Sequence, residues 1–450
     1  MHLKLAFRSL LRKIIYQLKK PYIAYYAPLM DTTFPQSPSS KFRINSRLSQ
    51  SLREIKQSDL KHNIGQLYSR TNTFATKVYS TFLPFNPNNI GNWSTIPNEE
   101  GTRRLEYELI HKIINLYHAS DKNIEGYATS GGTESNLYSI WVGKSYLLKH
   151  LKLDDICLFK TNLTHYSIDK SCQLCSILQF DIPLNNQAWI MDVNSLKEMI
   201  LQQIKNGKLG FIISLTLGYT ETGTIDDIQA INSAITQIKR QHKNIYVSII
   251  VDAAFDGLIL PFMINDFSPF SYKNVHAIAV DFSKFTAVPY PAGVVLYRKQ
   301  LRQLIEKAVP VFSMKDNTIT GSRSGASVAA MWAAIHHLGK KGFRKVISRQ
   351  IKLKHFFINQ ITQMFPNSKI ITSQHSLTCG VILDTKKNMH LSKEIEDKYW
   401  LYAKKTTFNF NNKKQKTAIL YKFFFLPQLT KESIQDFFTD IQRSFLNGRQ

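Results

Sequence analysis

The sequence predicts an α/β fold in which helices cover a largely parallel β-sheet. The first observation is a series of short apolar runs, each long enough for one buried strand. They occupy residues 156–159, 211–217, 246–251, 275–280 and 293–297. The second observation is that segments with helical periodicity separate these runs, as at residues 134–149 and 225–241. Strands that alternate with helices in this way are typical of an α/β layer.

The N-terminal part of the chain departs from this alternation. Apolar side chains recur at helical spacing through residues 1–26, and Lys and Arg fill much of the rest. Such a basic amphipathic helix either packs on a partner subunit, which we favour, or contacts an anionic membrane surface. Residues 30–50 are rich in Pro and Ser and predict a linker, and helical spacing returns at residues 48–68.

The length of 450 residues predicts more than one lobe. We divide the chain into a basic N-terminal helix and arm (residues 1–70), a large domain (71–330) and a small C-terminal α+β domain (331–450). A hydrophobic content of 43% supports a sizeable core and excludes a disordered chain. A long helix is expected after Gly325.

Charge and cysteine content limit the classes of function. A net charge of +26 suits nucleic acid or an anionic membrane, but no zinc finger or RNA-binding motif accompanies it. We therefore expect no nucleic-acid partner. Cys172 and Cys175 have metal-site spacing, yet no second Cys or His pair completes a site, so we expect no metal. With no run of 18 apolar residues for a membrane span, we expect a cytoplasmic protein.

Two charged side chains follow predicted strands. Asp252 comes directly after the run at residues 246–251, and Lys284 follows the run at 275–280. Ligands of parallel sheets bind at the carboxyl ends of the strands, which makes this pair a candidate site. Each residue alone is weak, because a lysine at a strand end is usually a solvated charge. An aspartate there is often a helix cap or an ion-pair partner.

A glycine-rich turn supplies a third group. Gly131, Gly132 and Thr133 stand where the helix at residues 134–149 begins. Backbone N–H groups and the helix dipole favour an anion such as phosphate at this position, although Thr133 could simply cap the helix. An imine-forming lysine, a carboxylate for a pyridinium nitrogen and a phosphate cradle are what pyridoxal 5'-phosphate (PLP) requires.

Further side chains extend the candidate site. His165 follows the strand at residues 156–159 and would stack on the cofactor ring, although a lone histidine is more often structural. Ala254 leaves room for a flat ring beside Asp252. Arg323 lies between small residues at a helix start, where a guanidinium suits bidentate capture of a substrate carboxylate. The alternative for Arg323 is a surface position.

These segments resemble the PLP-dependent group II amino-acid decarboxylases. The matching motifs are residues 126–138 (phosphate), 164–170 (stacking histidine), 218–227 (glycine–threonine loop), 251–262 (aspartate strand) and 318–325 (the motif after a mobile loop). The phosphate motif and residues 423–434 are most similar to bacterial histidine decarboxylases. Residues 291–294 and 323–326 are more similar to archaeal tyrosine/aspartate decarboxylases. The likeness runs from about residue 86 to the C-terminus.

The resemblance implies the PLP-dependent transferase fold of type I, a homodimer, and decarboxylation of an L-amino acid, with histidine to histamine as the best single choice. It implies catalytic roles for Lys284, His165 and Asp252, and substrate contacts for His165 and Arg323. The implied cofactor-binding set is Gly131, Gly132, Thr133, His165, Asp252, Ala254, Ser283 and Lys284.

Three positions depart from the family pattern. Ser283 stands where the family usually has a histidine before the lysine, and Asp281 replaces a serine of the histidine-decarboxylase form. Residues 309–315 lack the loop tyrosine that is associated with protonating the product carbanion. These departures leave open a PLP-binding protein without activity, and the basic N-terminal helix leaves open a carbon–carbon lyase of the sphingosine-phosphate type.

Overall fold

The computed structural model describes residues 38–57, 62–67, 70–92, 100–309, 314–410 and 414–447. Contacts divide the chain into two units, Met1–Asp59 and Leu60–Gln450. The described part of the first unit contains helix α2 (Lys41–Gln57), and the second unit contains both large sheets. The predicted helix of residues 1–26 lies outside the described residues.

One prediction for the N-terminal part is wrong, and another is confirmed in part. Residues 41–57 form α2 instead of continuing the linker, whereas the helix expected from residue 48 is confirmed through residue 57 and residues 63–67 are not helical. The linker prediction fails because the proline-rich composition ends before Ser40. The Ser40 hydroxyl oxygen accepts a hydrogen bond from Arg43 N at 3.3 Å, which is how a serine starts a helix. None of the helices in the ranges given above is long and apolar enough to cross a membrane.

The large sheet has seven strands in the order β1-β7-β6-β5-β4-β2-β3. Their bounds are β1 Ile124–Thr129, β2 Ile156–Lys160, β3 Leu178–Asp181, β4 Gly210–Thr216, β5 Tyr246–Asp252, β6 Val275–Asp281 and β7 Gly293–Arg298. The pairings from β3 through β6 are parallel, whereas β7 runs antiparallel to both neighbours. The predicted, largely parallel sheet is confirmed.

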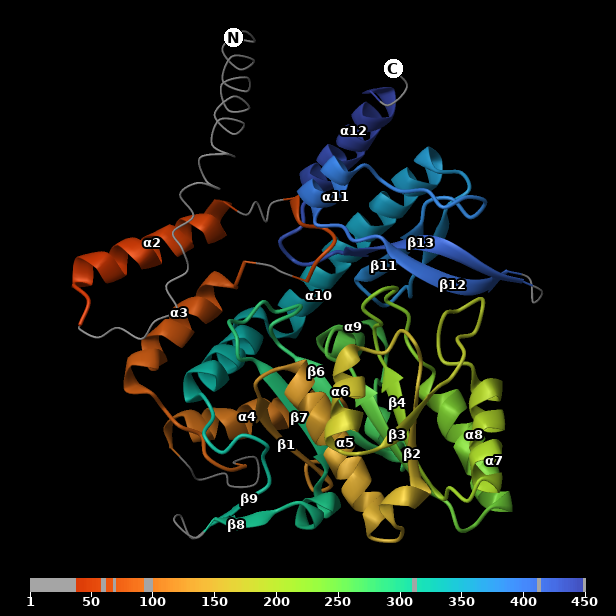
Figure 1. Ribbon diagram of the computed structural model, residues 1–450. Coiled ribbons are helices and arrows are strands. Elements are labelled where there is room, and N and C mark those ends of the chain that lie inside the picture. Colours follow the sequence, from red (N-terminus) through yellow and green to blue (C-terminus); the bar gives the residue numbers. More distant parts are fainter. Residues whose placement is uncertain are drawn as a thin grey trace. The chain divides into compact units, whose positions relative to one another are not determined.

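Helices cover both faces of this sheet (Figure 1). They are α4 Gly101–Leu116, α5 Gly132–Leu148, α6 Tyr166–Leu174, α7 Val193–Lys205 and α8 Ile228–Gln241. Side chains alternate along β4, so that Ile212 packs with α5 and α6 while Phe211 and Ile213 pack with α7 and α8. This alternation of apolar residues on both faces is why the strand is apolar throughout.

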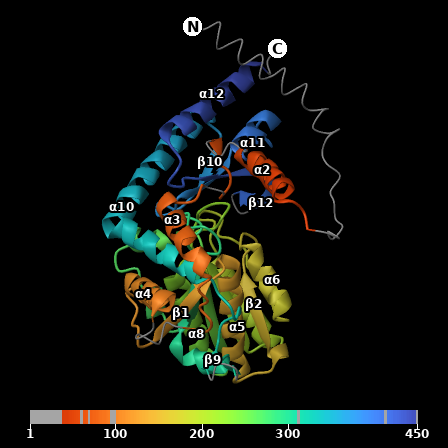
Figure 2. The ribbon, with the colours of Figure 1, turned by 90° about the vertical axis from the view of Figure 1, so that its left-hand side faces the viewer.

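A long helix leads into a smaller C-terminal domain. Helix α10 (Gly325–Met364) is the one expected after Gly325, and it changes direction at Gly339, which has φ +56°. Figure 2 shows α10 running from the large sheet toward α12 (Lys431–Asn447). The predicted domain boundary at residue 330 falls inside α10 and stays a prediction.

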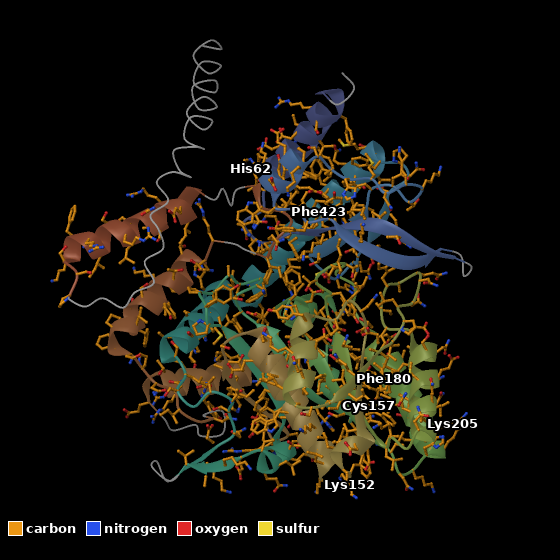
Figure 3. The ribbon with its side chains drawn as sticks, in the orientation of Figure 1. His62, Lys152, Cys157, Phe180, Lys205 and Phe423 are labelled. Atoms are coloured by element: carbon orange, nitrogen blue, oxygen red, sulfur yellow. The ribbon has the colours of Figure 1, made fainter. Side chains whose placement is uncertain are left out.

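The small domain is built on an antiparallel sheet in the order β10-β11-β13-β12. Its elements are β10 Lys369–Ile371, β11 Thr378–Ile382, α11 Lys393–Tyr399, β12 Lys404–Phe410 and β13 Lys414–Phe424. Phe423 packs on Phe357 of α10 with ring centroids 4.5 Å apart. Figure 3 labels Phe423 in this domain and Cys157 on β2 of the large one. The described chain also contains the shorter elements α3 Thr73–Phe82, α9 Leu260–Met263, β8 Lys307–Val309 and β9 Met314–Asp316.

A buried acid lies between the two domains. Asp256 is fully buried, and neither carboxyl oxygen has a hydrogen-bond partner in the described structure. It packs so closely under Gly218 that a Cβ there would lie 2.4 Å from Oδ2 of Asp256. Burial raises the pKa of Asp256 to about 8, and nearby Ser376 and Lys354 offset only part of that effect.

This acid makes stability depend on pH. The pKa of Asp256 in the folded protein lies above the ordinary value of 3.8. The stability that the protonated carboxyl gives, compared with the ionised one, is therefore fully present below about pH 4 and is lost as the pH rises toward 8. We expect Asp256→Asn to stabilise the protein by about 1–3 kcal/mol at pH 8 and to change little at pH 4. Urea unfolding at the two pH values measures this, with exposed Asp121→Asn as the control. Equal effects at both pH values would contradict it.

Candidate active site

The carboxyl ends of β4, β5 and β6 border a cavity of about 270 Å³. Seven of the predicted site residues line it: Gly131, Gly132, Thr133, His165, Asp252, Ala254 and Lys284. They come from four segments of the chain, each at or just after the end of a strand of the large sheet. The fold therefore brings together residues that lie more than a hundred positions apart in the sequence.

Lys284 stands in the turn after β6 and is partly buried. Its Nζ makes no hydrogen bond or ion pair with the part of the chain that the structure describes, and it faces the cavity lining. The turn is fixed behind it, because Phe282 N donates to Ala292 O at 2.8 Å and Ala287 N donates to Lys284 O at 3.2 Å. A positioned lysine without a counter-ion is suited to attack a carbonyl group.

Asp252 closes β5 and is 6% exposed. Its Oδ1 accepts a hydrogen bond from Ala254 N at 3.0 Å, and its Oδ2 accepts one from the Asn136 side chain at 2.8 Å. A buried carboxylate requires donors or a cation. These two donors leave lone pairs on both oxygens for a further donor in the cavity.

The start of α5 borders one end of the cavity. Gly131 has φ +148° and ψ −175°, a conformation open essentially to glycine alone. A Cβ on Gly132 would lie 3.0 Å from Cβ of Ala254, so the turn is packed tightly against β5. The N–H groups of Thr133 and Glu134 have no partner among the described residues. Free amides at a helix start bind phosphate.

Asp281 organises this turn. Its Oδ2 accepts from Gly132 N at 3.1 Å, and its Oδ1 accepts from Ser283 N at 2.8 Å and from Ser283 Oγ at 2.6 Å. The departure from the family pattern thus ties the end of β6 to the start of α5. The Ser283 hydroxyl is committed to Asp281, and Ser283 does not line the cavity, so this placement gives no support to its expected phosphate contact.

Arg323 lies elsewhere. It is 7% exposed and pairs with Glu106 through Nη1 and Nη2, and its Nη1 also donates to Ala128 O at 2.9 Å. It lines a separate cavity of about 140 Å³. Both charges of this pair are buried, so removing either one leaves the other uncompensated. The structure therefore does not bring Arg323 to Lys284, and the expected substrate contact gains no support.

Two residues that the sequence analysis did not single out belong to the site. Asn136 donates to Asp252, and Ser167 accepts from Asn136 at 3.0 Å. Asn136 stands inside the glycine-rich motif and Ser167 beside His165, so their neighbours in sequence were the available signal. The sequence positions of Asn136 and Ser167 do not show that two helices direct these side chains at each other.

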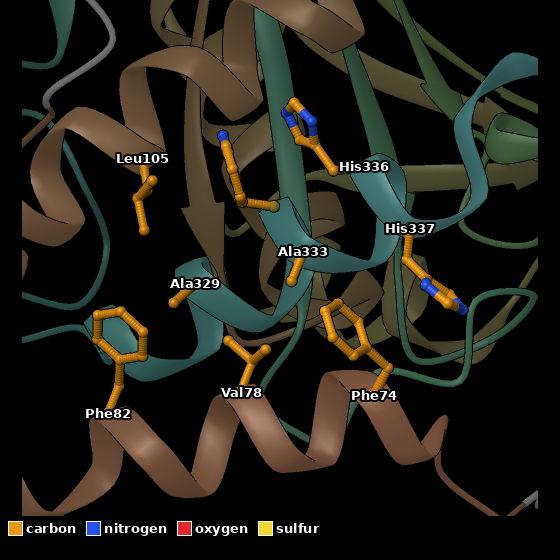
Figure 4. A pocket seen from close by; sticks show the side chains of 9 residues that line it. Phe74, Val78, Phe82, Leu105, Ala329, Ala333, His336 and His337 are labelled. Atoms are coloured by element: carbon orange, nitrogen blue, oxygen red, sulfur yellow. The ribbon is translucent and has the colours of Figure 1, made fainter.

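A larger cavity of about 530 Å³ lies between α3 and α10 (Figure 4). Phe74, Val78 and Phe82 approach it from α3, and Ala329 and Ala333 from α10. Its described lining contains two histidines but no lysine or carboxylate, so it lacks the groups for PLP chemistry. In the described residues, no cluster of His, Cys, Asp or Glu is arranged to hold a metal ion.

The residues of the smaller cavity fit PLP. The unpaired amides at the start of α5 suit its phosphate, the buried Asp252 carboxylate suits its ring nitrogen, and the unpaired Lys284 amine suits its aldehyde. Ala254 presents only a methyl group between these ends, which leaves space for a flat ring.

Comparison with known proteins agrees with this chemistry. Residues 24–382 match the pyridoxal-dependent decarboxylase conserved domain. Tryptophan decarboxylase of Clostridium sporogenes is 29% identical over 330 residues, 71% of this chain and 76% of that protein. Histidine decarboxylase of Acinetobacter baumannii is 30% identical over 339 residues, 71% of this chain and 84% of that protein.

Among solved structures, L-methionine decarboxylase of Streptomyces sp. 590 superposes with a TM-score of 0.76 at 17% identity and covers 91% of this chain and 97% of its own. This likeness concerns the fold, since the sequence identity is low. The domain match spans the glycine-rich turn, both strand-end residues and the lysine that together form the cavity. The chain belongs to the family of pyridoxal-dependent decarboxylases, and it is a PLP-dependent carboxy-lyase.

Proposed function

We propose that this carboxy-lyase decarboxylates an L-amino acid with an uncharged, flat side chain, and that histidine, converted to histamine, is its substrate. The observation that carries the proposal is the single cavity shared by Lys284, Asp252 and the start of α5. Bound PLP supplies an electron sink for the electrons left on Cα when the bond between Cα and the carboxylate carbon breaks. The protein's own groups bind and orient the reactants around it.

Each residue has a proposed task. Lys284 would hold the cofactor covalently until the substrate amine replaces it. Asp252 would keep a proton on the ring nitrogen, because a buried carboxylate stabilises the adjacent positive charge. The amides at the start of α5 would bind the phosphate. His165 would cover the ring on the side opposite Ala254.

The remaining lining supports an uncharged substrate. Leu67, Leu163, Phe255 and Tyr290 contribute apolar or aromatic surface. In the described lining, Lys284 is the one lysine and there is no arginine, so the carboxylate of an acidic side chain would find no cation of its own. Burying an unpaired charge is costly, which disfavours aspartate and glutamate. Relatives are named for histidine and tryptophan but also for aspartate and glutamate, so the preference for a ring-shaped side chain rests on the cavity lining.

A substrate screen tests this assignment. We expect carbon dioxide release from the twenty amino acids to be greatest with histidine, followed by tryptophan. Acidic amino acids should react at least about a hundredfold more slowly in kcat/KM, because their side-chain charge would be left unpaired. A preference for aspartate or glutamate would refute the substrate proposal. Release from none of them would favour the alternative of a PLP-binding protein without activity.

A second test concerns the lysine. Borohydride reduction of the PLP-loaded protein should fix the label on Lys284, and Lys284→Ala should abolish both the label and the visible absorbance. Lys422 is a suitable control, because it lies near enough to Lys284 for the two charges to interact. Lys422→Ala should retain the label in the peptide that contains Lys284. A label found on any other lysine would overturn the assignment.

We also propose a cytoplasmic homodimer in which residues 1–26 pack on the partner subunit, with a membrane surface as the alternative contact. Exposed Phe74 and Phe85, at 42% and 81%, support an additional apolar contact near α3. Deleting residues 1–26 should weaken dimerisation in sedimentation velocity while PLP absorbance is kept. Loss of binding to anionic vesicles instead would favour the membrane contact, and no change in either measurement would contradict both.

A further inference from the structure

A chain of hydrogen bonds joins Asp252 to His165 through two side chains. Asn136 Nδ2 lies 2.8 Å from Asp252 Oδ2 and 3.0 Å from Ser167 Oγ. Ser167 Oγ in turn lies 2.8 Å from His165 Nδ1. The exposed fractions of Asn136, Ser167 and Asp252 are 2%, 0% and 6%. The chain is therefore largely shielded from water, which strengthens each bond and makes a missing partner costly.

Hydrogen-bond chemistry determines the direction of both bonds that Asn136 makes in this chain. A carboxylate can only accept, so the group of Asn136 that faces Asp252 is the amide NH₂. That nitrogen has two hydrogens, and the second is directed at Ser167 Oγ. Ser167 Oγ thus acts as an acceptor toward Asn136, and its own hydrogen is available for His165 Nδ1 when that nitrogen carries no proton.

A second donor confirms the state of the imidazole. The backbone N–H of Ser167 also points at His165 Nδ1, at 3.3 Å, as part of the cap of α6. A nitrogen that receives two donors carries a lone pair and no proton. The proton of the neutral ring is therefore on Nε2. A proton on Nδ1 would instead face the hydrogens of the Ser167 hydroxyl and the Ser167 backbone N–H.

We propose that Asn136 and Ser167 are positioning residues that fix the chemical forms of both active-site partners. They hold Asp252 as an acceptor for the cofactor ring nitrogen, and they hold His165 as the tautomer whose Nε2–H is available as a donor. His165 then serves as a hydrogen-bond donor for an anionic group such as the substrate carboxylate, and not as a base at Nε2. This inference rests on the proposed function for its kinetic consequences alone.

The helix starts explain why these two residues meet. Asn136 is in the second turn of α5 and Ser167 is in the first turn of α6, and both helices begin at the carboxyl edge of the sheet. The two helices are in contact. A serine at position 167 is thus able to reach both the cap histidine of its own helix and the amide of the neighbouring one.

The first measurement does not depend on activity. In protein labelled with ¹⁵N on the histidine rings, without cofactor, His165 should show an unprotonated Nδ1 and a protonated Nε2, with its signals assigned by their loss in His165→Phe. Ser167→Ala and Asn136→Leu should move His165 toward a mixture of tautomers. Ser167→Thr keeps a hydroxyl and should restore the wild-type pattern.

Ser171→Ala is the matched control. Ser171 stands one turn further along α6, is equally buried at 1%, and bonds to the Ser167 carbonyl outside the chain. It should leave the His165 signals unchanged. If Ser167→Ala gives the wild-type tautomer, or if Ser171→Ala shifts it equally, the positioning role is overturned. A purely structural role predicts equal effects of the two variants.

The kinetic measurement uses the PLP-loaded enzyme with its best amino acid. Ser167→Ala and Asn136→Leu should each lower kcat about ten- to a hundredfold, with KM changed by less than about threefold. The double variant should lose little more than the worse single one, because both break the same chain. Additive losses would overturn the coupling. A tautomer shift in a protein that decarboxylates nothing would refute the proposed function while supporting the positioning role.

Discussion

The close approach of the start of α5 to the ends of β5 and β6 and to the start of β7 is the contact on which the site depends. Gly132 lies against Ala254, and a Cβ on Gly293 would lie 2.6 Å from Cα of Gly131. This backbone-to-backbone packing requires glycine, because any side chain would push the helix away from the sheet. Because the start of α5 packs directly against the sheet, its free amides share one cavity with Asp252 and Lys284.

Asp281 shows how an acid is compatible with an anion-binding turn. A carboxylate beside a phosphate site repels the ligand if its charge is uncompensated. Here three donors from Gly132 and Ser283 satisfy it, so its charge is used to fasten β6 to α5. In this arrangement the Ser283 backbone N–H and hydroxyl both bond to Asp281, which supports the turn that precedes Lys284.

Arg323 has a comparable supporting role next to the glycine-rich turn that precedes α5. It binds the Ala128 carbonyl at the end of β1, one residue before the sequence turns toward Gly131, and Glu106 of α4 neutralises it. Glu106 also accepts from Ala128 N at 2.9 Å. The buried pair therefore holds both backbone groups of Ala128, and it fixes the strand from which the glycine turn departs.

The sequence alone determined the α/β class, five of the seven strands of the large sheet and the residues around Lys284, because buried parallel strands are continuous apolar runs with chemistry at their ends. It did not indicate β1, which carries Glu125 and Gly126, or β3, whose side chains are partly exposed. It predicted a cofactor contact for Ser283 and a substrate contact for Arg323. Residue type and local spacing do not show which partner a side chain meets in the fold. Only the tertiary structure decided that, by placing Asp281 and Glu106 beside them and Asn136 beside Asp252.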